Sequence, residues 1–349
     1  MPQEQEPEES YCYSCDNSYT LDELYTSEHD HELRCFDCND DHYAAYEDED
    51  GDSYGIFDYS YTPELNFWND AGIANSRARR SPAGWLSDNS LWVSAVKTNP
   101  VLTDLYLGPE IEVECTDGKI AKGADWVYDQ AGRDVVYLKH DGSLSHGFEI
   151  VGHPGTLGYY MNHFNWDAIT GLSDLGFKSW NRRSCGLHVH LSRSAFVDEK
   201  HLFKFFYLFY KNSREMVQFA GRESGFASWS IREFLSRYNT WGESDDLVGH
   251  SFMKYAKGEA INDNRYCAIN LRRRQTIELR FFRPSLRKET VQAAFQMCDA
   301  AHRYTASLST QDVMKNNALA FGAFREWIAS NPFDNRYLVL DARINERVL

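Results

Sequence analysis

The feature that most constrains the fold is the strict alternation of apolar and charged residues in the segment IELRF. Ile277, Leu279 and Phe281 point to one side of an extended chain, because successive side chains of a strand alternate between its two faces. Glu278 and Arg280 point to the other side. The segment therefore predicts a strand that buries one face and carries charge on the second.

Arginine is unusually dense around this strand. Arg265 and Asn270 precede it, residues 272–274 are all arginine, and Arg283 follows it. Guanidinium groups bind planar anions such as carboxylate and phosphate through paired hydrogen bonds. The cluster therefore indicates an anionic partner, and an edge strand with solvated arginines is the alternative.

Three further segments repeat the same alternating design. They are EIEVE at 110–114, FEIV at 148–151 and LHVHL at 187–191. Opposite their apolar residues they present Glu110, Glu112, Glu114, Glu149, His188 and His190. Carboxylates on one sheet face repel each other unless cations neutralise them, and carboxylates with imidazole suit Mg²⁺ or Mn²⁺. The four strands together predict a divalent-cation site. The alternative is a solvated outer sheet face on which the histidines form a satisfied polar pair.

A turn signal lies between the first two of these strands, in the sequence KHDGS. Lys139 and Asp141 in this turn are candidates for contacts to a phosphate or an amine. Divalent cations and arginines together disperse the charge of phosphate oxygens, which is what phosphoryl transfer requires.

The N-terminal segment contains two CxxC pairs, Cys12 with Cys15 and Cys35 with Cys38. Two such pairs at this spacing predict a tetrahedral Zn²⁺ site with four thiolate ligands. A segment this short cannot close a hydrophobic core, so zinc would supply the folding free energy. A redox CxxC motif and incidental cysteines are the alternatives.

The charge balance narrows the classes of partner. The chain has 36 basic and 52 acidic side chains, for a net charge of −16. This balance argues against non-specific binding to nucleic acid or to an anionic membrane. No apolar run approaches the length of a membrane-spanning helix, and the acidic start MPQEQEPEES does not resemble a secretory signal. We therefore expect a cytoplasmic protein.

Periodicity and composition predict four units along the chain. Residues 1–50 form the zinc module with an acidic linker, and residues 51–104 an irregular, aromatic-rich connector. Residues 105–315 form the main domain, and residues 316–349 a C-terminal helix and tail. Helices are expected around 158–176, 199–220, 286–307 and 317–330, with a strand or tail in the last dozen residues.

The order of the motifs resembles the glutamine synthetase-like carboxylate–amine ligases. The shared order is GxExE, a glutamate strand, GLHVH, and then NRxxxxN with IELRF. The segments KHDGSLSHGFEIV and CGLHVHLS are in particular similar to the amidoligase family, over about residues 105–300. The resemblance implies an α+β fold in which an antiparallel sheet carries a metal and nucleotide face and helices pack on its other face. The small zinc module lies outside it.

The resemblance also implies roles for single residues. The ligands of two divalent ions would be Glu110, Glu112, Glu149, His188 and Glu278. His190 would lie near the nucleotide, Arg265 would contact ATP phosphates, and Arg280 would hold the transferred phosphate and the substrate carboxylate. Further candidates for phosphate binding are Lys139, Asn270 and Arg283. The candidates for catalysis are Arg280, Glu149 and Asp141.

Two positions depart from the pattern of glutamine synthetase. Asn270 stands where that enzyme has a second arginine, and only Glu149 stands where it supplies two glutamates. The resemblance therefore does not carry glutamate or ammonia over as substrates.

The predicted function is an ATP-dependent ligase that joins a carboxylate to an amine through an acyl phosphate, using ATP, Mg²⁺ or Mn²⁺, and structural Zn²⁺. Substrates would be an amino acid, a peptide or a protein side chain. The zinc module would recruit a protein partner, and the protein would be able to form an oligomer. The family resemblance implies a bacterial or phage-infected cell as the setting. The alternative is a non-catalytic adaptor with a degenerate ligase-like scaffold. A metal-dependent hydrolase ranks last, since it has no use for the arginines.

Overall fold

The computed structural model describes thirteen stretches of the chain. They are residues 9–11, 18–20, 24–26, 33–35, 56–57, 65–75, 104–115, 119–180, 184–222, 227–229, 266–271, 276–330 and 335–348. The fold and its contacts are those of these residues.

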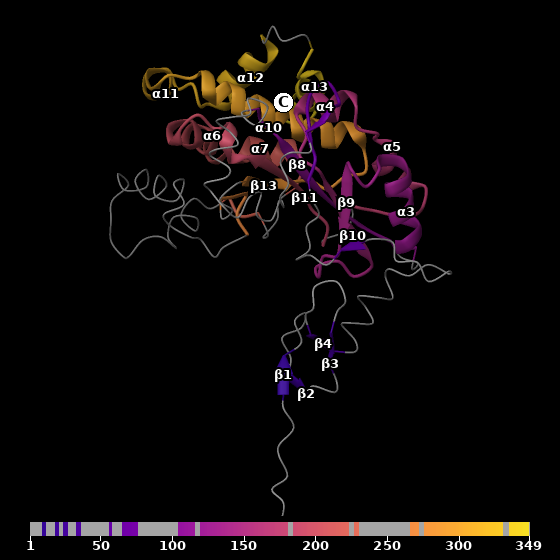
Figure 1. Cartoon of the computed structure of the whole chain (residues 1–349). Helices are drawn as coiled ribbons and strands as arrows, with labels where there is room; N and C mark the ends of the chain where they lie inside the picture. Colours follow the sequence, from indigo (N-terminus) through magenta and orange to yellow (C-terminus); the bar gives the residue numbers. More distant parts are fainter. Residues whose placement is uncertain are drawn as a thin grey trace, which may run out of the picture.

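A seven-stranded sheet forms the centre of the described structure (Figure 1). In spatial order its strands are β12 (Ile269–Asn270), β13 (Thr276–Phe282), β11 (Leu187–Ser192), β8 (Leu107–Glu114), β10 (Gly147–Gly152), β9 (Val136–Lys139) and β5 (Ile56–Phe57). The first six pair antiparallel, and β5 lies parallel to β9 at the edge. The predicted mixed α+β fold with an antiparallel sheet is confirmed for six strands, and the parallel strand at the edge was not predicted.

The four strands with the alternating design are neighbours, in the order β13, β11, β8, β10. Between β11 and β13 the register shifts, so that Leu187 pairs with Phe282 but Val189 pairs with Leu279. This bulge places one extra residue of β13 opposite His188. Bulges re-aim side chains and are enriched beside functional sites.

Helices cover the apolar side of this sheet. The ring of Phe209 in α6 (Glu199–Lys211) lies 5.6 Å from that of Phe281, and Trp229 lies 4.8 Å from the same ring. The helix α10 (Lys288–Ser307) contacts β11, and α3 (Ile120–Ala131) contacts β9. Aromatic packing thus fixes the sheet from the side opposite its charged residues.

The long helix α10 organises the helical layer. It contacts α4 (Leu157–Asn162), α6, α12 (Phe321–Ala329) and α13 (Leu338–Arg347) as well as the sheet. Most of its residues are buried, as expected for a helix that is covered on several sides. The helices predicted over 286–307 and 317–330 are confirmed as α10 and α12, with α12 four residues shorter at its start.

The single helix predicted over 199–220 is two helices, α6 and α7 (Ser213–Ala220), which meet at Asn212. The side chain of Asn212 donates to the carbonyls of Leu208 and Leu319, at 2.7 and 2.8 Å, and accepts from the N–H of Phe321 at 2.9 Å. The side chain at the break thus bonds to Leu319 and Phe321, which are distant in the sequence. Helical periodicity does not reveal a break of this kind.

The prediction of one helix around 158–176 is also corrected. The chain forms α4, then α5 (Asp167–Thr170) and a short 3-10 turn, Gly171–Ser173. Asn165 interrupts the helix, because its side-chain oxygen accepts from the N–H of Asp167 at 3.1 Å. The helix α3, which buries Ala124, Val127 and Tyr128, was not predicted.

The end of the chain differs from the predicted strand or tail, because residues 338–347 form α13. Leu340 and Ile344 are buried at helical spacing, and the N–H of Leu340 donates to Gln296 of α10 at 2.8 Å. Two short helical elements complete the layer: Arg193–Ala195, a 3-10 turn, and α11 (Thr310–Lys315), which begins with a capping box at Ser309.

Three hairpins precede β8 in the sequence. They are β1 (Glu9–Tyr11) with β2 (Ser18–Thr20), β3 (Leu24–Thr26) with β4 (Leu33–Cys35), and β6 (Phe67–Trp68) with β7 (Ala74–Asn75). Cys35 ends β4, its side chain is not described, and Cys12, Cys15 and Cys38 lie outside the described residues. The zinc site therefore stays a prediction.

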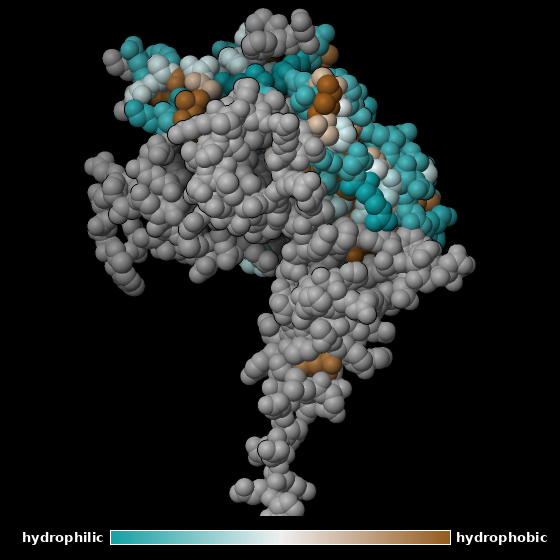
Figure 2. Space-filling model, viewed as in Figure 1, coloured by the Kyte–Doolittle hydropathy of each residue, from teal (hydrophilic) through white to brown (hydrophobic). Residues whose placement is uncertain are grey.

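None of the described helices combines the length and the apolar character needed to cross a membrane. The described surface seen in Figure 2 is mostly hydrophilic, with small hydrophobic patches. The four cysteines outside the N-terminal segment are buried, as expected of small apolar side chains.

Replacement of Asn212 by Ala should destabilise the fold. Its three hydrogen bonds would be lost and buried carbonyls left without a donor, so we expect a loss of about 2–3 kcal/mol in the free energy of unfolding. Urea unfolding measures this loss. Asn162→Ala, at an exposed asparagine at the end of α4, is the control; equal losses in both variants would contradict the role of Asn212.

Acid should weaken the fold through His153, which is 2% exposed and accepts from the N–H of Asn66 at 3.0 Å. Burial lowers the pKa of His153 to about 4, against an ordinary value of 6.5. Between pH 6.5 and 4 the unfolded chain binds a proton on this histidine that the folded protein does not bind. The free energy of unfolding therefore falls as pH decreases, by about 1.4 kcal/mol per pH unit.

The replacement His153→Gln should make this pH dependence shallower between pH 6.5 and 4, although the buried His201 and His302 preserve part of it. His146→Gln, at an exposed position, should leave the dependence unchanged. Urea unfolding at several pH values measures both, and an unaltered slope in His153→Gln would show that this residue is not responsible.

Candidate functional site

One face of the central sheet carries the polar residues of all four alternating strands, and we call it the ligand face. Its members are Glu110, Glu112, Glu149, His188, His190 and Glu278. The register aligns them in cross-strand pairs: Glu110 opposite His188, Glu112 opposite Glu149, and Glu278 opposite His190. The predicted metal ligands thus lie on adjacent strands, which sequence spacing alone did not determine.

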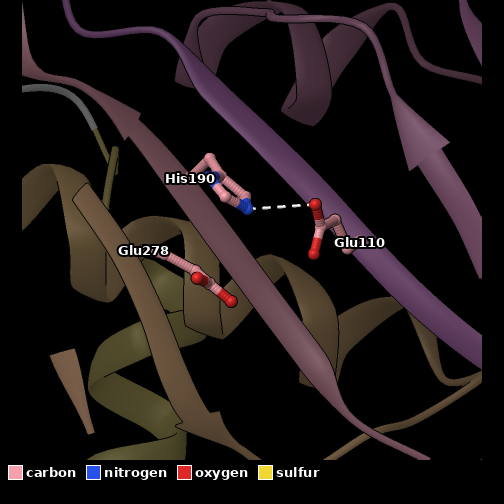
Figure 3. Close-up of side chains that lie close together, drawn as sticks. All are labelled: Glu110, His190 and Glu278. Carbon is pink, nitrogen blue, oxygen red and sulfur yellow. Dashed lines mark ion pairs between the residues drawn. The ribbon is translucent and has the colours of Figure 1, made fainter. Parts of the chain in front are cut away.

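The tightest group on this face is Glu110, His190 and Glu278 (Figure 3). These residues come from β8, β11 and β13, and each offers a ligand atom within 4.8 Å of the other two. The closest approach is 3.0 Å, between His190 Nε2 and Glu110 Oε1. Two carboxylates and one imidazole at such separations could hold one divalent cation.

The two histidines have different surroundings. His188 Nδ1 lies 3.4 Å from Glu110 Oε2 and 3.6 Å from Glu278 Oε1. His190 Nδ1 is 3.1 Å from the hydroxyl of Thr276, which orients its ring so that Nε2 faces the carboxylates. The resemblance assigns His188 to metal and His190 to nucleotide, whereas the geometry places His190 itself in the candidate metal group.

Glu278 is held by two neighbours predicted to contact phosphate. The amide of Asn270 donates to its Oε2 at 2.7 Å, and Arg280 forms an ion pair with its Oε1. The Nε atom of Arg280 is buried and has no hydrogen-bond partner within the described structure. Asn270 therefore orients a carboxylate, while Arg280 retains donors for another anion.

The carboxylates of the ligand face have divergent pKa values. Burial alone would raise the pKa of Glu110, but the charges of His190 and His188 hold it well below its ordinary range. Burial likewise opposes ionisation of Glu278, and Arg280 overcomes it and lowers the pKa. Burial raises the pKa of Glu149 well above normal, and the charge of Glu110 adds to the shift.

Burial also raises the pKa of Glu112, and Asp141 contributes to this rise. Two carboxylates are thus stabilised as anions by basic neighbours, and two resist ionisation. A cation bound between them would favour the ionised form of all four.

The KHDGS turn lies near the β10 side of this face. Lys139 pairs with Glu149 in the register, and its charge opposes the rise in the pKa of that glutamate. Asp141 accepts from the N–H of Ser143 at 2.7 Å, which closes the turn. Lys139 therefore lies beside Glu149, and the charge of Asp141 adds to the rise in the pKa of that glutamate.

Three residues of the sequence prediction stand apart from this group. The carboxylate of Glu114 accepts a hydrogen bond from the N–H of Ser145 at 2.8 Å, so it binds the loop before β10. The guanidinium of Arg283 lies 5.5 Å from the ring centre of Trp180, beyond the end of β13. Arg265 lies outside the described residues.

The structure adds three residues that sequence reasoning missed. Tyr137 of β9 is buried on the same side as Glu149, and burial with the charge of Glu110 raises its pKa well above normal. Gly186 lies against His188 and Glu112, and the glycine of CGLHVH was the available signal. Arg222 lies near Glu112 and Arg280, and no motif of the sequence distinguishes it.

The sequence comparisons do not identify a family. No model of a known protein family matches the chain, and no curated protein matches it. The residues and their geometry therefore carry the functional proposal.

Gly186→Ala tests whether a metal ion binds on the part of the ligand face beside His188. A methyl group there would lie 2.6 Å from His188 Nε2 and 3.2 Å from Glu112 Oε2, so the imidazole must move. We expect the affinity for Mn²⁺ to fall by about tenfold or more, as for other changes that displace ligands. Calorimetric titration with Mn²⁺ measures this.

Gly322→Ala in α12 is the control, since its methyl group would meet nothing within 4 Å. Equal Mn²⁺ affinity in Gly186→Ala and in the wild type would show that the ion does not bind beside His188.

Proposed function

We propose that the protein is an ATP-dependent carboxylate–amine ligase of the glutamine synthetase-like type, with the ligand face as its active site. The observation that carries the proposal is the convergence of Glu110, His190 and Glu278 from three adjacent strands, with Arg280 paired to Glu278. A cation site and a guanidinium in direct contact fit a phosphate group better than they fit a purely structural role.

The residues present suit Mg²⁺ or Mn²⁺. Carboxylate oxygens bind both ions, and the imidazole of His190 favours Mn²⁺. Glu112, Glu149 and His188 lie on the adjoining part of the face and would complete a second position. Bound divalent cations would neutralise the phosphate oxygens of ATP and orient its terminal phosphate.

The chain's own residues would provide the remaining contacts. Arg280 would use its free donors to hold the transferred phosphate beside the substrate carboxylate. Asn270 keeps Glu278 in place, and Thr276 keeps the ring of His190 turned toward it. Lys139 and Asp141 would contact the phosphate or the incoming amine at the other side of the face.

The resemblance to the amidoligase family completes the proposal. It supplies ATP as the nucleotide, an acyl phosphate as the activated substrate and Arg265 as a further phosphate contact. The substrates would be an amino acid, a peptide or a protein side chain. The N-terminal cysteines would bind structural zinc and recruit a protein partner.

A metal-dependent hydrolase would use the same carboxylates to activate water. It leaves the ion pair of Arg280 with Glu278 and the adjoining arginines without a purpose. The ligase explains both the carboxylates and the guanidinium groups, and we therefore prefer it.

Calorimetric titration with ATP in the presence of Mg²⁺ or Mn²⁺ tests this function without knowledge of the substrate. Wild-type binding should require the ion, and Glu278→Gln and Arg265→Ala should each weaken it by at least about tenfold. Glu326→Gln, at an exposed glutamate of α12, should bind as the wild type does.

Hydroxylamine offers a second test, since it traps acyl phosphates as hydroxamates. Incubation with ATP and a panel of carboxylates should yield hydroxamate and ADP with the wild type but not with Glu278→Gln. No metal-dependent ATP binding by folded wild-type protein would overturn the ligase and favour the adaptor.

A further inference from the structure

Four arginines gather where α7 ends, beside the last residues of β13 and of α13. We call Arg222, Arg283, Arg343 and Arg347 the α7 arginine cluster. Arg222 and Arg283 come just after α7 and β13, and Arg343 and Arg347 belong to α13; α7 contacts both β13 and α13. In a chain with a net charge of −16, such a group of cations is unexpected.

The cluster surrounds Gly221, which ends α7 in the left-handed region at φ +65°. A methyl group on Gly221 would lie 3.8 Å from both Arg283 Nη1 and Arg347 Nη1. The two guanidinium groups therefore flank the same point. Burial lowers the pKa of Arg343, and the like charge of Arg347 lowers it further.

Of these four arginines, only Arg343 is shown to cap the C-terminus of α7. The N–H of Gly221 already donates to the carbonyls of Val217 and Gln218, and Arg343 Nε donates to that of Phe219 at 3.2 Å. The carbonyls of Val217, Gln218 and Phe219 thus have donors without Arg222, Arg283 or Arg347.

The three remaining arginines have donors to spare. Arg222 Nη1 donates to the carbonyl of Phe282 at 3.2 Å, and Arg283 lies over the exposed ring of Trp180. Neither forms an ion pair with a carboxylate of the described structure. Arg347 Nε forms an ion pair with Glu346 Oε1 at 3.4 Å. Each guanidinium carries five donors in a planar fork, so several donors are left for a ligand.

The cluster is continuous with the ligand face along β13. Arg222 is near Arg280 and Glu112, and its bond to Phe282 lies four residues along the strand from Glu278. Four residues of strand correspond to roughly 13 Å. The charge along this path changes from carboxylate at the centre of the sheet to guanidinium at its end.

We propose that the α7 arginine cluster binds an oxyanionic group, carboxylate or phosphate, of the substrate handled at the ligand face. This inference rests on the proposed function for the identity of the ligand as substrate. The separation implies an extended substrate whose anionic group lies on the order of 10 Å from the reacting centre. Three to four residues of extended peptide span that distance, so a short peptide with a terminal or side-chain carboxylate fits.

The test uses two probes, inorganic phosphate and citrate, titrated calorimetrically into the full chain at low ionic strength. Arg283→Gln and Arg347→Gln each remove a cation, and we expect each to weaken binding by about tenfold. Arg222→Lys keeps the charge but loses the planar fork, and it should bind more weakly than the wild type. A preference for one probe identifies the phosphate or the carboxylate as the natural group.

Arg214→Gln is the matched control, because Arg214 is an exposed arginine of the same helix. It should bind both probes within about twofold of the wild type, as expected for a solvated charge. Thermal unfolding of every variant shows whether it is folded, and Arg347→Gln alters an exposed side chain that folding does not require.

Titration of the same proteins with Mn²⁺ separates this inference from the proposed function. Mn²⁺ affinity should stay unchanged in Arg347→Gln, whose exposed side chain lies outside the ligand face, and fall in Glu110→Gln. Anion binding that is absent from the wild type, or equal in all variants, would overturn the role of the cluster while leaving the metal site standing. Mn²⁺ binding that is absent while the cluster binds anions would overturn the proposed function and leave an anion site without its substrate.

Discussion

Ionisable side chains are buried on one face of the central sheet, and their neighbours have to compensate the cost of that burial. Glu112, Glu149, His188, His190 and Glu278 are each between 4% and 7% exposed. Buried charges are costly unless they are paired, and carboxylates in adjacent cross-strand positions also repel each other. The histidines, Arg280 and the raised pKa of Glu149 offset part of this cost. A divalent cation would offset more of it, which links the stability of the sheet to its proposed function.

The helical layer keeps this arrangement in place. Asp299 of α10 is buried and accepts hydrogen bonds from Arg336 at 3.1 Å and from Tyr337 at 2.6 Å, which anchors the start of α13. Burial opposes the ionisation of Asp299, but Arg336 and Arg303 overcome it and lower its pKa. Because α13 in turn contacts α7, this buried pair also fixes the position of the α7 arginine cluster. Stability on one side of the sheet thus determines where anions can bind at its end.

Local sequence pattern predicted the four charged strands because the period of two survives in any strand buried on one side. It also predicted α10 and α12, whose helical patterns are long enough to be distinctive. It did not predict the break at Asn212, since the side chain there bonds to Leu319 and Phe321, more than a hundred residues away. For the same reason the sequence predicts a strand or tail where α13 forms: the burial of Leu340 and Ile344 depends on their packing in the folded protein.

The alternation of apolar and charged residues along each strand was enough to identify Glu110, Glu149, His188 and Glu278 as candidate metal ligands on polar strand faces. The tertiary structure sets their order in space, because strand pairing depends on contacts between distant segments. It placed His190 with Glu110 and Glu278, and it turned Asn270 toward Glu278. It also placed Arg283 and Arg347, which lie far apart in the sequence, beside Gly221. The spacing of residues along a strand determines to which face each side chain points, whereas a site built from several strands forms only when the strands pair.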